Sequence, residues 1–420
     1  MSDEPALLAA ILANPDEDTP RLAYADWLDE YADTLGRARA EFIRLQIEAA
    51  AGIATPQRRK RVETRCAELE STHGEKWFAP VWRAVTHFDA GGWSVKPGFR
   101  RGFVERATAG AAPGWVSVVA ARCPLREVEF LGHPTAPDPA AWAKLAESQA
   151  LAGIRRMDFE ALPISIARAL FPSPHLTGLQ ALRLGWVTAE SMEAIAASPA
   201  AAGLRELRVS GGYSTAPPGS CFRALLSAKW PAIEDLRVDR FEVTDARLRE
   251  LTAECARRRM RRLHVTDLQH LTGAGARAAA ELVLSGAPSG FAAGSPMVRE
   301  AQFDPPPAAR ELSFRGFYGE GDNFAAWVRA EVPPGRFDRL AISGCRMNAS
   351  GAVILSAWAG LADLVELDLS NNWIGDLGAV HLADSPHLAN IEQLFVAHND
   401  LTKRGKDALK KRFGRRVRIA

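Results

Sequence analysis

The chain has 420 residues, 47% of them hydrophobic, and its 52 basic and 50 acidic side chains nearly cancel to a formal net charge of +2. Such a chain can bury a large core, and its overall charge does not direct it to nucleic acid, a membrane surface or a strongly charged substrate. Five widely spaced cysteines without a Cys-x-x-Cys pair, and the absence of any apolar run of about 18 residues, predict a cytoplasmic protein without a membrane span.

Helix signals dominate the first 85 residues. Thr19-Pro20 provides an N-cap and a proline at the start of a helix, and an apolar-aromatic stripe that includes Trp27 follows it. The segments 37–50 and 56–69 show further helical patterns with alternating blocks of charge. We therefore expect an all-α domain over residues 1–55, followed by a helical connector and N-terminal cap over 56–110.

Two blocks in this region, AILANPDEDTPRLAYADWLDE (residues 10–30) and RAEFIRLQ (residues 39–46), have a weaker echo in GFRRGFVERAT (residues 98–108). Together they resemble the repeat-companion domain found at the N-terminus of many planctomycete proteins, commonly ahead of leucine-rich repeats. Where that family has a Gly-Asp-Pro turn, this chain has Ala32-Asp33-Thr34. The resemblance implies an architecture and no reaction.

A repeat of about 27 residues is clearest near the C-terminus. The segment LVELDLSNNWI fits the template L-x-x-L-x-L-x-x-N-x-L, and FDRLAISGCRM and IEQLFVAHNDL fit it 27 residues before and after. The asparagine position holds Cys345, Asn372 and Asn399 in these three copies. We expect these residues to form a structural ladder along the loops that follow the strands.

Weaker copies extend the repeat toward the N-terminus. Copies begin at Leu125, Ile154, Leu179, Leu204, Ile233, Met260 and Ala309. All but one interval suit a strand plus a helix, and we interpret the Gly/Pro/Ser-rich residues 286–307 in the longest interval as an inserted loop. The pattern predicts an α/β solenoid, a leucine-rich-repeat horseshoe with a parallel concave sheet and convex helices. About ten repeats would span 111–401, and 402–420 would form a C-terminal cap.

Position five of each predicted strand points to the concave surface. In chain order it holds Glu129, Asp158, Arg183, Arg208, Arg237, His264, Ser313, Ala341, Asp368 and Phe395. Like charges on adjacent strands repel, so this column needs acidic neighbours or an acidic ligand. Glu206 and Asp235 could supply the neighbours, which would make the face a balanced solvated surface. Alternatively, the arginines, with Arg262 in support, bind an acidic protein segment or a phosphate-bearing ligand.

Trp186 lies near this column and is a candidate anchor for a partner, since tryptophan and arginine are enriched at binding hot spots. Its alternative role is to pack against the following loop. Few other aromatic residues lie on the predicted face, which argues against single-stranded nucleic acid as a ligand. The basic C-terminus is interpreted as a final helix, a stop at Gly414 and a closing strand, rather than as a tail for nucleic acid or lipid.

Motifs of catalysis and metal binding are absent from the sequence: there is no phosphate-binding loop, nucleophile elbow or His-Glu-x-x-His helix. We therefore predict no enzyme activity, cofactor or metal. The predicted function is a scaffold for protein–protein interaction that binds a partner at Arg183, Trp186, Arg208, Arg237, Arg262 and His264. Two alternatives are a regulatory subunit of an enzyme and a nucleic-acid binder. The sequence leaves the partner, the oligomeric state and the role of the N-terminal domain open.

Overall fold

The structure, a computed structural model, describes residues 3–52, 55–85, 95–110, 112–132, 138–210, 220–227, 230–239, 243–258, 260–266, 271–284, 290–294 and 310–419. The chain divides into two compact units. The first unit is Met1–Leu204 with Ala228–Ala232, and the second is Arg205–Ser227 with Ile233–Ala420.

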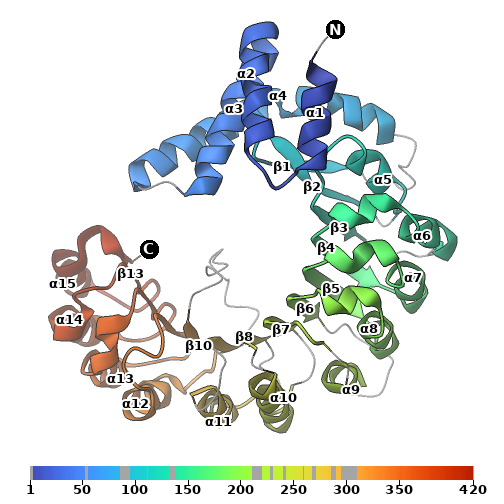
Figure 1. Ribbon diagram of the computed structural model, residues 1–420. Coiled ribbons are helices and arrows are strands. Elements are labelled where there is room, and N and C mark those ends of the chain that lie inside the picture. The colour runs from blue at the N-terminus through green and yellow to red at the C-terminus, as the bar shows by residue number, and fades with distance from the viewer. Residues whose placement is uncertain are drawn as a thin grey trace. The chain divides into compact units, whose positions relative to one another are not determined.

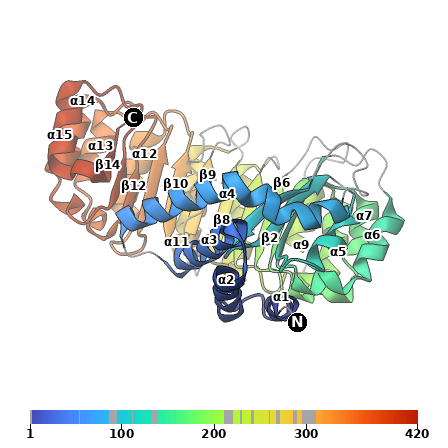
Figure 2. The same cartoon turned by 90° about the horizontal axis from the view of Figure 1, so that it is seen from above.

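The first unit begins with four helices, α1 (Glu4–Ala13), α2 (Thr19–Tyr31), α3 (Thr34–Ala51) and α4 (Pro56–Val85). The carboxylate of Asp33 caps α3 by accepting a hydrogen bond from the Gly36 backbone N–H, at 2.9 Å. Helices α3 and α4 lie side by side (Figure 2), and Phe42 of α3 packs against Trp77 of α4. The helical character expected for the N-terminal region is confirmed.

Residues 96–110, which we expected to belong to a helical connector, instead form an antiparallel hairpin of strands β1 (Lys96–Arg100) and β2 (Phe103–Gly110). The turn is made by Arg101 and Gly102, which both have positive φ angles. Alternating exposure along β2, with Phe103 buried among the residues of helices α1 to α3, explains why a strand replaces the predicted helix. The segment 98–108, which resembles part of the repeat-companion domain, therefore lies in the hairpin that the N-terminal helices contact.

Strands β3 (Glu127–Leu131), β4 (Arg156–Leu162) and β5 (Ala181–Val187) continue from β2 as parallel neighbours in the first unit. Strands β2 to β5 are each followed by outer elements, seen in Figure 1 beside the strands. These are α5 (Trp115–Ala120), α6 (Pro139–Ala146), α7 (Ile164–Leu170), α8 (Ala189–Ala196), and the 3-10 helices η2 (Gln149–Gly153), η3 (Pro174–Gly178) and η4 (Pro199–Ala202). Phe130 and Phe159, from neighbouring strands, stack at 5.0 Å between ring centroids, so each repeat buries its apolar side chains against the next.

The second unit repeats this pattern. Its strands, in spatial and chain order, are β6 (Glu206–Ser210), β7 (Asp235–Asp239), β8 (Arg262–Thr266), β9 (Gly290–Gly294), β10 (Glu311–Arg315), β11 (Arg339–Ser343), β12 (Glu366–Asp368), β13 (Gln393–Phe395) and β14 (Val417–Arg418). Its helices are α9 (Ser220–Ser227), α10 (Asp245–Arg257), α11 (Gly273–Leu284), α12 (Gly321–Glu331), α13 (Ala349–Ser356), α14 (Gly375–Asp384) and α15 (Lys403–Phe413), with η5 (Ala359–Asp363), η6 (Pro386–Leu388) and η7 (Gly414–Arg416). The predicted α/β solenoid of leucine-rich-repeat type is confirmed.

Strand β9 corrects one prediction. Gly290–Gly294 lies within the segment 286–307 that we interpreted as an inserted loop, yet it pairs in parallel with both β8 and β10. The segment therefore contributes a repeat strand, and the long interval is close to two repeats. The sequence GFAAG hid it, because only Phe291 is a large apolar residue at a template position. The rest of the predicted loop lies outside the described residues.

The C-terminal end of the second unit follows the predicted order of helix, stop and strand. Helix α15 ends at Phe413, Gly414 has a φ of 57°, and β14 pairs in parallel with β13. Leu409 and Phe413 are buried, while the lysines and arginines of α15 are exposed. The basic residues thus lie on the outer side of a packed terminal element.

Candidate interaction surface on the strands

The three ladder residues are buried beneath the loops that follow the strands. Asn372 Oδ1 accepts hydrogen bonds from the backbone N–H groups of Cys345 and Met347, both at 3.0 Å, and its Nδ2 donates to Ile342 O at 2.6 Å. Asn399 Nδ2 donates to Leu369 O at 2.8 Å. The Cys345 thiol donates to Ser343 O at 3.3 Å, and burial raises the pKa of this thiol to about 12. All three side chains therefore serve loop structure rather than chemistry.

In the first unit, Arg183 of strand β5 is exposed and stands in register beside Asp158 of β4. Burial raises the pKa of Asp158, while Arg156 and Arg183 act in the opposite direction. Asp158 accepts a hydrogen bond from Arg156 Nε at 3.1 Å, and no ion pair of Arg183 occurs within the described parts of the chain. The side chain of Arg183 is thus available at the strand surface.

Trp186 lies three residues further along β5, and 41% of its surface is exposed. A tryptophan that packed fully beneath the following loop would be buried, as Trp142 of helix α6 is. Strand β5 therefore carries an exposed arginine and a half-exposed tryptophan, three residues apart.

In the second unit, Arg208, Arg237 and His264 stand in register on strands β6, β7 and β8. Arg208 Nε lies 3.0 Å from Oδ2 of Asp239, a carboxylate two residues beyond Arg237 on β7. We did not predict this partner, because we considered only acids at position three as neighbours. The repulsion expected between Arg208 and Arg237 is therefore relieved by an acid on the adjacent strand.

Arg262, predicted as a supporting contact, is buried on strand β8, and its Nη1 lies 3.6 Å from Asp235 Oδ2. Asp235 was one of the two acids expected to balance the column, and it does stand next to Arg262 in register. Because Arg262 is buried, little of its surface is accessible to a partner. Its charge acts instead on neighbouring groups and helps to lower the pKa of His264.

His264 is mostly buried, and its Nε2 lies 3.9 Å from Oε2 of Glu311 on strand β10. Strand β9 lies between the two, with Ala292 opposite His264 and Gly290 next to the Glu311 backbone, which leaves room for the side chains to approach. Burial holds the pKa of His264 well below its ordinary value, with the charges of Arg237, Arg262 and Arg315 acting in the same direction. Burial likewise raises the pKa of Glu311. The sequence did not reveal this pair because it did not reveal β9.

Two further ion pairs lie on the same face of the second unit. Arg315 Nη1 is 3.2 Å from Asp368 Oδ2, and Arg339 Nη1 is 3.2 Å from Glu366 Oε2. Arginines and carboxylates therefore alternate across these strands. This arrangement favours the balanced surface over a continuous basic patch in the second unit, whereas exposed Arg183 in the first unit lacks such a partner among the described residues.

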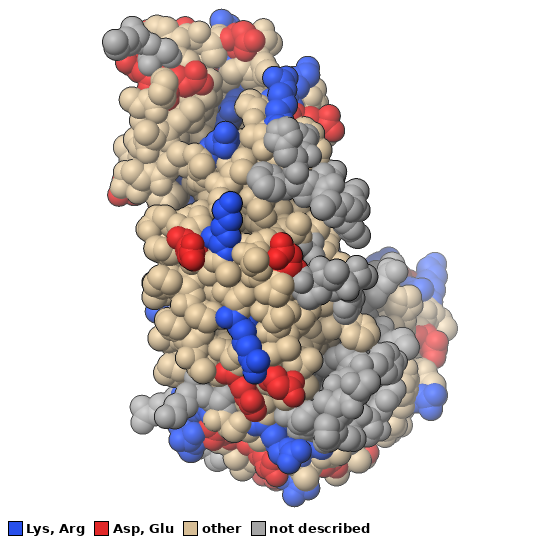
Figure 3. Space-filling view, turned by 90° about the vertical axis from the view of Figure 1, so that its right-hand side faces the viewer, with Lys and Arg blue, Asp and Glu red and all other residues tan. Residues whose placement is uncertain are grey.

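The helices on the outer side of the repeats carry fewer candidate binding residues than the strands. Helices α6 to α8 carry mostly alanine and other uncharged residues, with separate charged side chains such as Lys144, Arg168 and Glu190. The face shown in Figure 3 is mostly tan, with separate blue and red side chains. Within the described residues, no group of three or more His, Cys, Asp or Glu could hold a metal ion, and no helix is both long and apolar enough to cross a bilayer.

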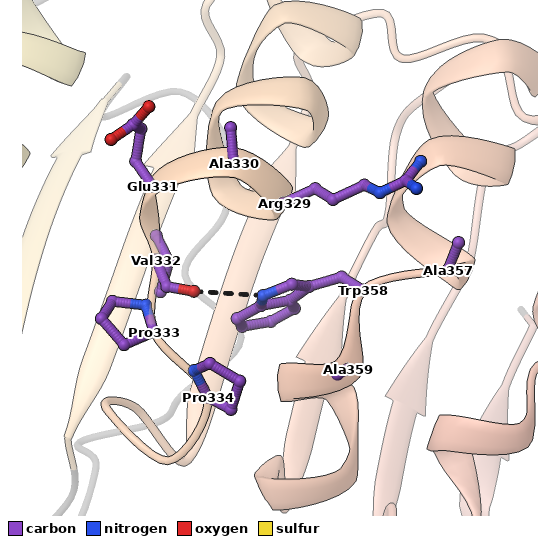
Figure 4. Close-up of a pocket in the computed structure, with 9 residues that line it drawn as sticks. All are labelled: Arg329, Ala330, Glu331, Val332, Pro333, Pro334, Ala357, Trp358 and Ala359. Atoms are coloured by element: carbon purple, nitrogen blue, oxygen red, sulfur yellow. Dashed lines mark hydrogen bonds between the residues drawn. The ribbon is translucent and has the colours of Figure 1, made fainter.

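A pocket of about 360 Å³ lies between the end of α12 and the α13–η5 connection in the second unit (Figure 4). Its wall is the indole of Trp358, which is buried and donates from Nε1 to Val332 O at 3.2 Å. Pro333, Pro334 and Ala359 are among the apolar residues of the lining, and the two charged residues are Arg329 and Glu331. It is a packing feature between repeats rather than a site built for a ligand.

No family model and no curated protein matches this chain. Among solved structures, it is similar to a chain of the yeast Rad7 and Elc1 complex, with 16% identity and a TM-score of 0.37 over 65% of this chain and 74% of that one. It is also similar to an internalin, inlF, from Listeria monocytogenes, with 14% identity and a TM-score of 0.36 over 75% of this chain and 87% of that one. For the TLR13–ssRNA13 complex the identity is 16% and the TM-score 0.35, over 66% of this chain and 40% of that one. Likeness at this level carries no information on function.

Proposed function

We propose that this protein is a non-enzymatic scaffold that binds a partner protein on its strand face. The observation that supports the proposal is that strand β5 carries two exposed side chains three residues apart, Arg183 and half-exposed Trp186. Arginine and tryptophan are among the residues most enriched at binding hot spots. A surface presented by paired strands is already ordered, so little conformational entropy is lost on binding.

An acidic segment of the partner is the best match to Arg183. A guanidinium binds a carboxylate through two parallel hydrogen bonds. In the second unit, Arg208 and Arg237 would also bind carboxylates of the partner, with Arg208 shared between the partner and Asp239. Arg262 lies beneath this surface, and its proposed role is to keep the surface positive when the partner approaches, while His264 beside it stays neutral.

The N-terminal helices are proposed to cap the repeats. The buried guanidinium of Arg21 on α2 donates to the carbonyls of Arg100 and Arg101 in the β1–β2 hairpin, at 3.3 and 3.2 Å. Gln46 of α3 accepts from the Gly102 N–H at 2.8 Å. These contacts join all three blocks that resemble the repeat-companion domain. Strand β1 in turn covers the edge of β2, which would otherwise expose unpaired backbone groups.

The test compares affinity capture from a nuclease-treated native lysate by the wild-type chain and by Arg183→Glu and Trp186→Ala variants. Arg168→Glu, on the outer face of helix α7, is the matched control because it makes the same charge change at another exposed arginine. A partner that the control retains and both strand variants lose supports the proposal, and binding of that purified partner should weaken with salt.

A partner retained by every variant would refute the strand-face assignment. In a parallel capture without nuclease, recovery of nucleic acid with a steep loss of affinity as salt rises would favour a nucleic-acid binder instead. Capture of an enzyme whose turnover changes when this chain binds would favour the regulatory-subunit alternative. The triple variant Arg183→Glu, Arg208→Glu, Arg237→Glu extends the test to the second unit.

A further inference from the structure

Three long side chains are exposed on successive loops of the second unit, after strands β10, β11 and β12. Tyr318 is 70% exposed, Trp373 is 54% exposed, and Arg346 is exposed between them. The Arg346 guanidinium carbon lies 5.1 Å from the centroid of the Tyr318 ring and 4.9 Å from that of Trp373. The three side chains form a cation–π stack at the surface, which we call the loop stack.

A buried frame holds the loops that carry the loop stack. Arg346 has a φ of 56°, uncommon for a residue other than glycine, and the residues on either side of it are tied to Asn372. The backbone N–H of Trp373 donates to Met347 O at 2.7 Å, and the backbone N–H of Gly319 donates to Cys345 O at 3.1 Å. All three loops are therefore fixed to one another through the backbone around Arg346.

The composition and order of the loop stack are those of a binding hot spot. Single exposed apolar side chains are common on protein surfaces, but here two large aromatic rings and an arginine are joined. Tyrosine, tryptophan and arginine dominate interface energies. Their mutual stacking already restricts their rotamers, which lowers the entropy that a partner must overcome.

The charges around the loop stack indicate what kind of partner fits. Asp322 and Asp376 lie in the first turns of helices α12 and α14, directly after two of these loops, whereas Glu320 in the first loop is paired with Arg277 at 2.6 Å. These acids serve local structure: Asp322 accepts from the Asn348 N–H at 2.9 Å, and Asp376 from the Thr402 N–H at 2.9 Å. A nucleic-acid strand would bring its phosphates toward this negative charge, which disfavours it although its bases could stack on the rings.

We propose that the loop stack is a docking site for an extended, proline-containing segment of a partner protein with no net negative charge. Proline rings pack on the faces of exposed aromatic side chains, and a polyproline II segment loses little entropy on binding. Such a segment also leaves its backbone carbonyls free to accept from the guanidinium of Arg346 and the indole N–H of Trp373. This site is independent of the strand face.

The test is selection of a random dodecapeptide library, displayed on phage, against the full-length protein. Phage that bind the Tyr318→Ala/Trp373→Ala double variant are removed first. We expect the remaining peptides to be enriched in proline, and a synthetic peptide from the selection to bind the double variant at least 10-fold more weakly than the wild type. Trp186→Ala, which removes a half-exposed tryptophan elsewhere, should bind the peptide like the wild type.

Arg346→Lys separates stacking from charge, because lysine keeps the charge and loses the planar group. We expect it to weaken the selected peptide by several-fold. Far-UV circular dichroism and thermal unfolding should match the wild type for every variant, since the replaced side chains are exposed. Selected peptides without proline, or peptides that bind the double variant equally well, would overturn the proposal. So would a uridine 20-mer RNA that binds the wild type and not the double variant, because it would assign the loop stack to nucleic acid.

Discussion

Replacing Glu105 with alanine should release the N-terminal helices from the β1–β2 hairpin. The carboxylate of Glu105 lies 2.8 Å from Nη2 of Arg21, and the two side chains are only 4% and 0% exposed. Burial lowers the pKa of Arg21 and raises that of Glu105, and the attraction between the two only partly opposes this. The substitution would leave Arg21 charged, buried and without its carboxylate.

The expected magnitude follows from that geometry. Breaking a buried ion pair from one side typically costs about 3–5 kcal/mol, because the remaining charge stays desolvated. Arg101 Nη2 also lies 3.0 Å from Glu105, so a second cation loses its partner, although Arg101 retains Asp18 at 3.4 Å. At about 1.4 kcal/mol for each factor of ten, the free energy of local opening should fall enough to speed exchange by about 100-fold or more.

Hydrogen–deuterium exchange followed by mass spectrometry measures this opening directly in peptides from 4–51 and 96–110. Peptides from the second unit should exchange as in the wild type. Glu17→Ala is the matched control, since Glu17 is an exposed acid in the same region. The double variant Arg21→Met/Glu105→Leu removes both charges and should recover much of the lost protection. Wild-type exchange in Glu105→Ala would refute the claim that this ion pair holds the helices to the hairpin.

Three other predictions concern single positions. Gly102→Ala should destabilise the hairpin by about 2 kcal/mol or more, measured by the same exchange experiment, because Gly102 has a φ of 81° and an added Cβ would lie 2.1 Å from Ile43 Cγ1; unchanged exchange would contradict this packing. Asn372→Ala should lower the free energy of unfolding in urea by about 1–3 kcal/mol, because it strips partners from buried backbone groups, whereas exposed Asn390→Ala should have a much smaller effect. His264 stays neutral in the folded state, so below its unfolded pKa of about 6.5 the unfolded chain binds a proton that the folded chain does not. The free energy of unfolding of the wild type should therefore decrease as the pH is lowered, by up to about 1.4 kcal/mol per pH unit. His264→Asn should reduce this slope between pH 6.5 and 5.5 in urea titrations, and an identical slope in both proteins would show that His264 is not buried in neutral form.

The repeat could be recognised in the sequence because it depends on apolar side chains at fixed positions. The apolar positions of Leu364, Leu367 and Leu369 are filled by other apolar residues 27 residues before and after, because each copy buries the same positions against the next. Strand β9 escaped detection because Gly290, Ala292 and Gly294 carry almost no side-chain signal, and its place comes from pairing with β8 and β10. The hairpin at 96–110 was missed because its neighbours belong to helices far earlier in the chain.

By itself, the sequence determined the solenoid class, the helical start, the order of the terminal cap, and the strand positions of Arg183, Arg208 and Arg237. All of these follow from local periodicity and from the alternation of side chains along a strand. Only the tertiary structure decided which charges are balanced: Asp239 reaches Arg208 from the next strand, Glu311 reaches His264 across a strand of small residues, and Arg183 remains exposed. It also brought Tyr318, Arg346 and Trp373 together from three separate loops, because contacts between repeats depend on backbone paths that no single repeat encodes.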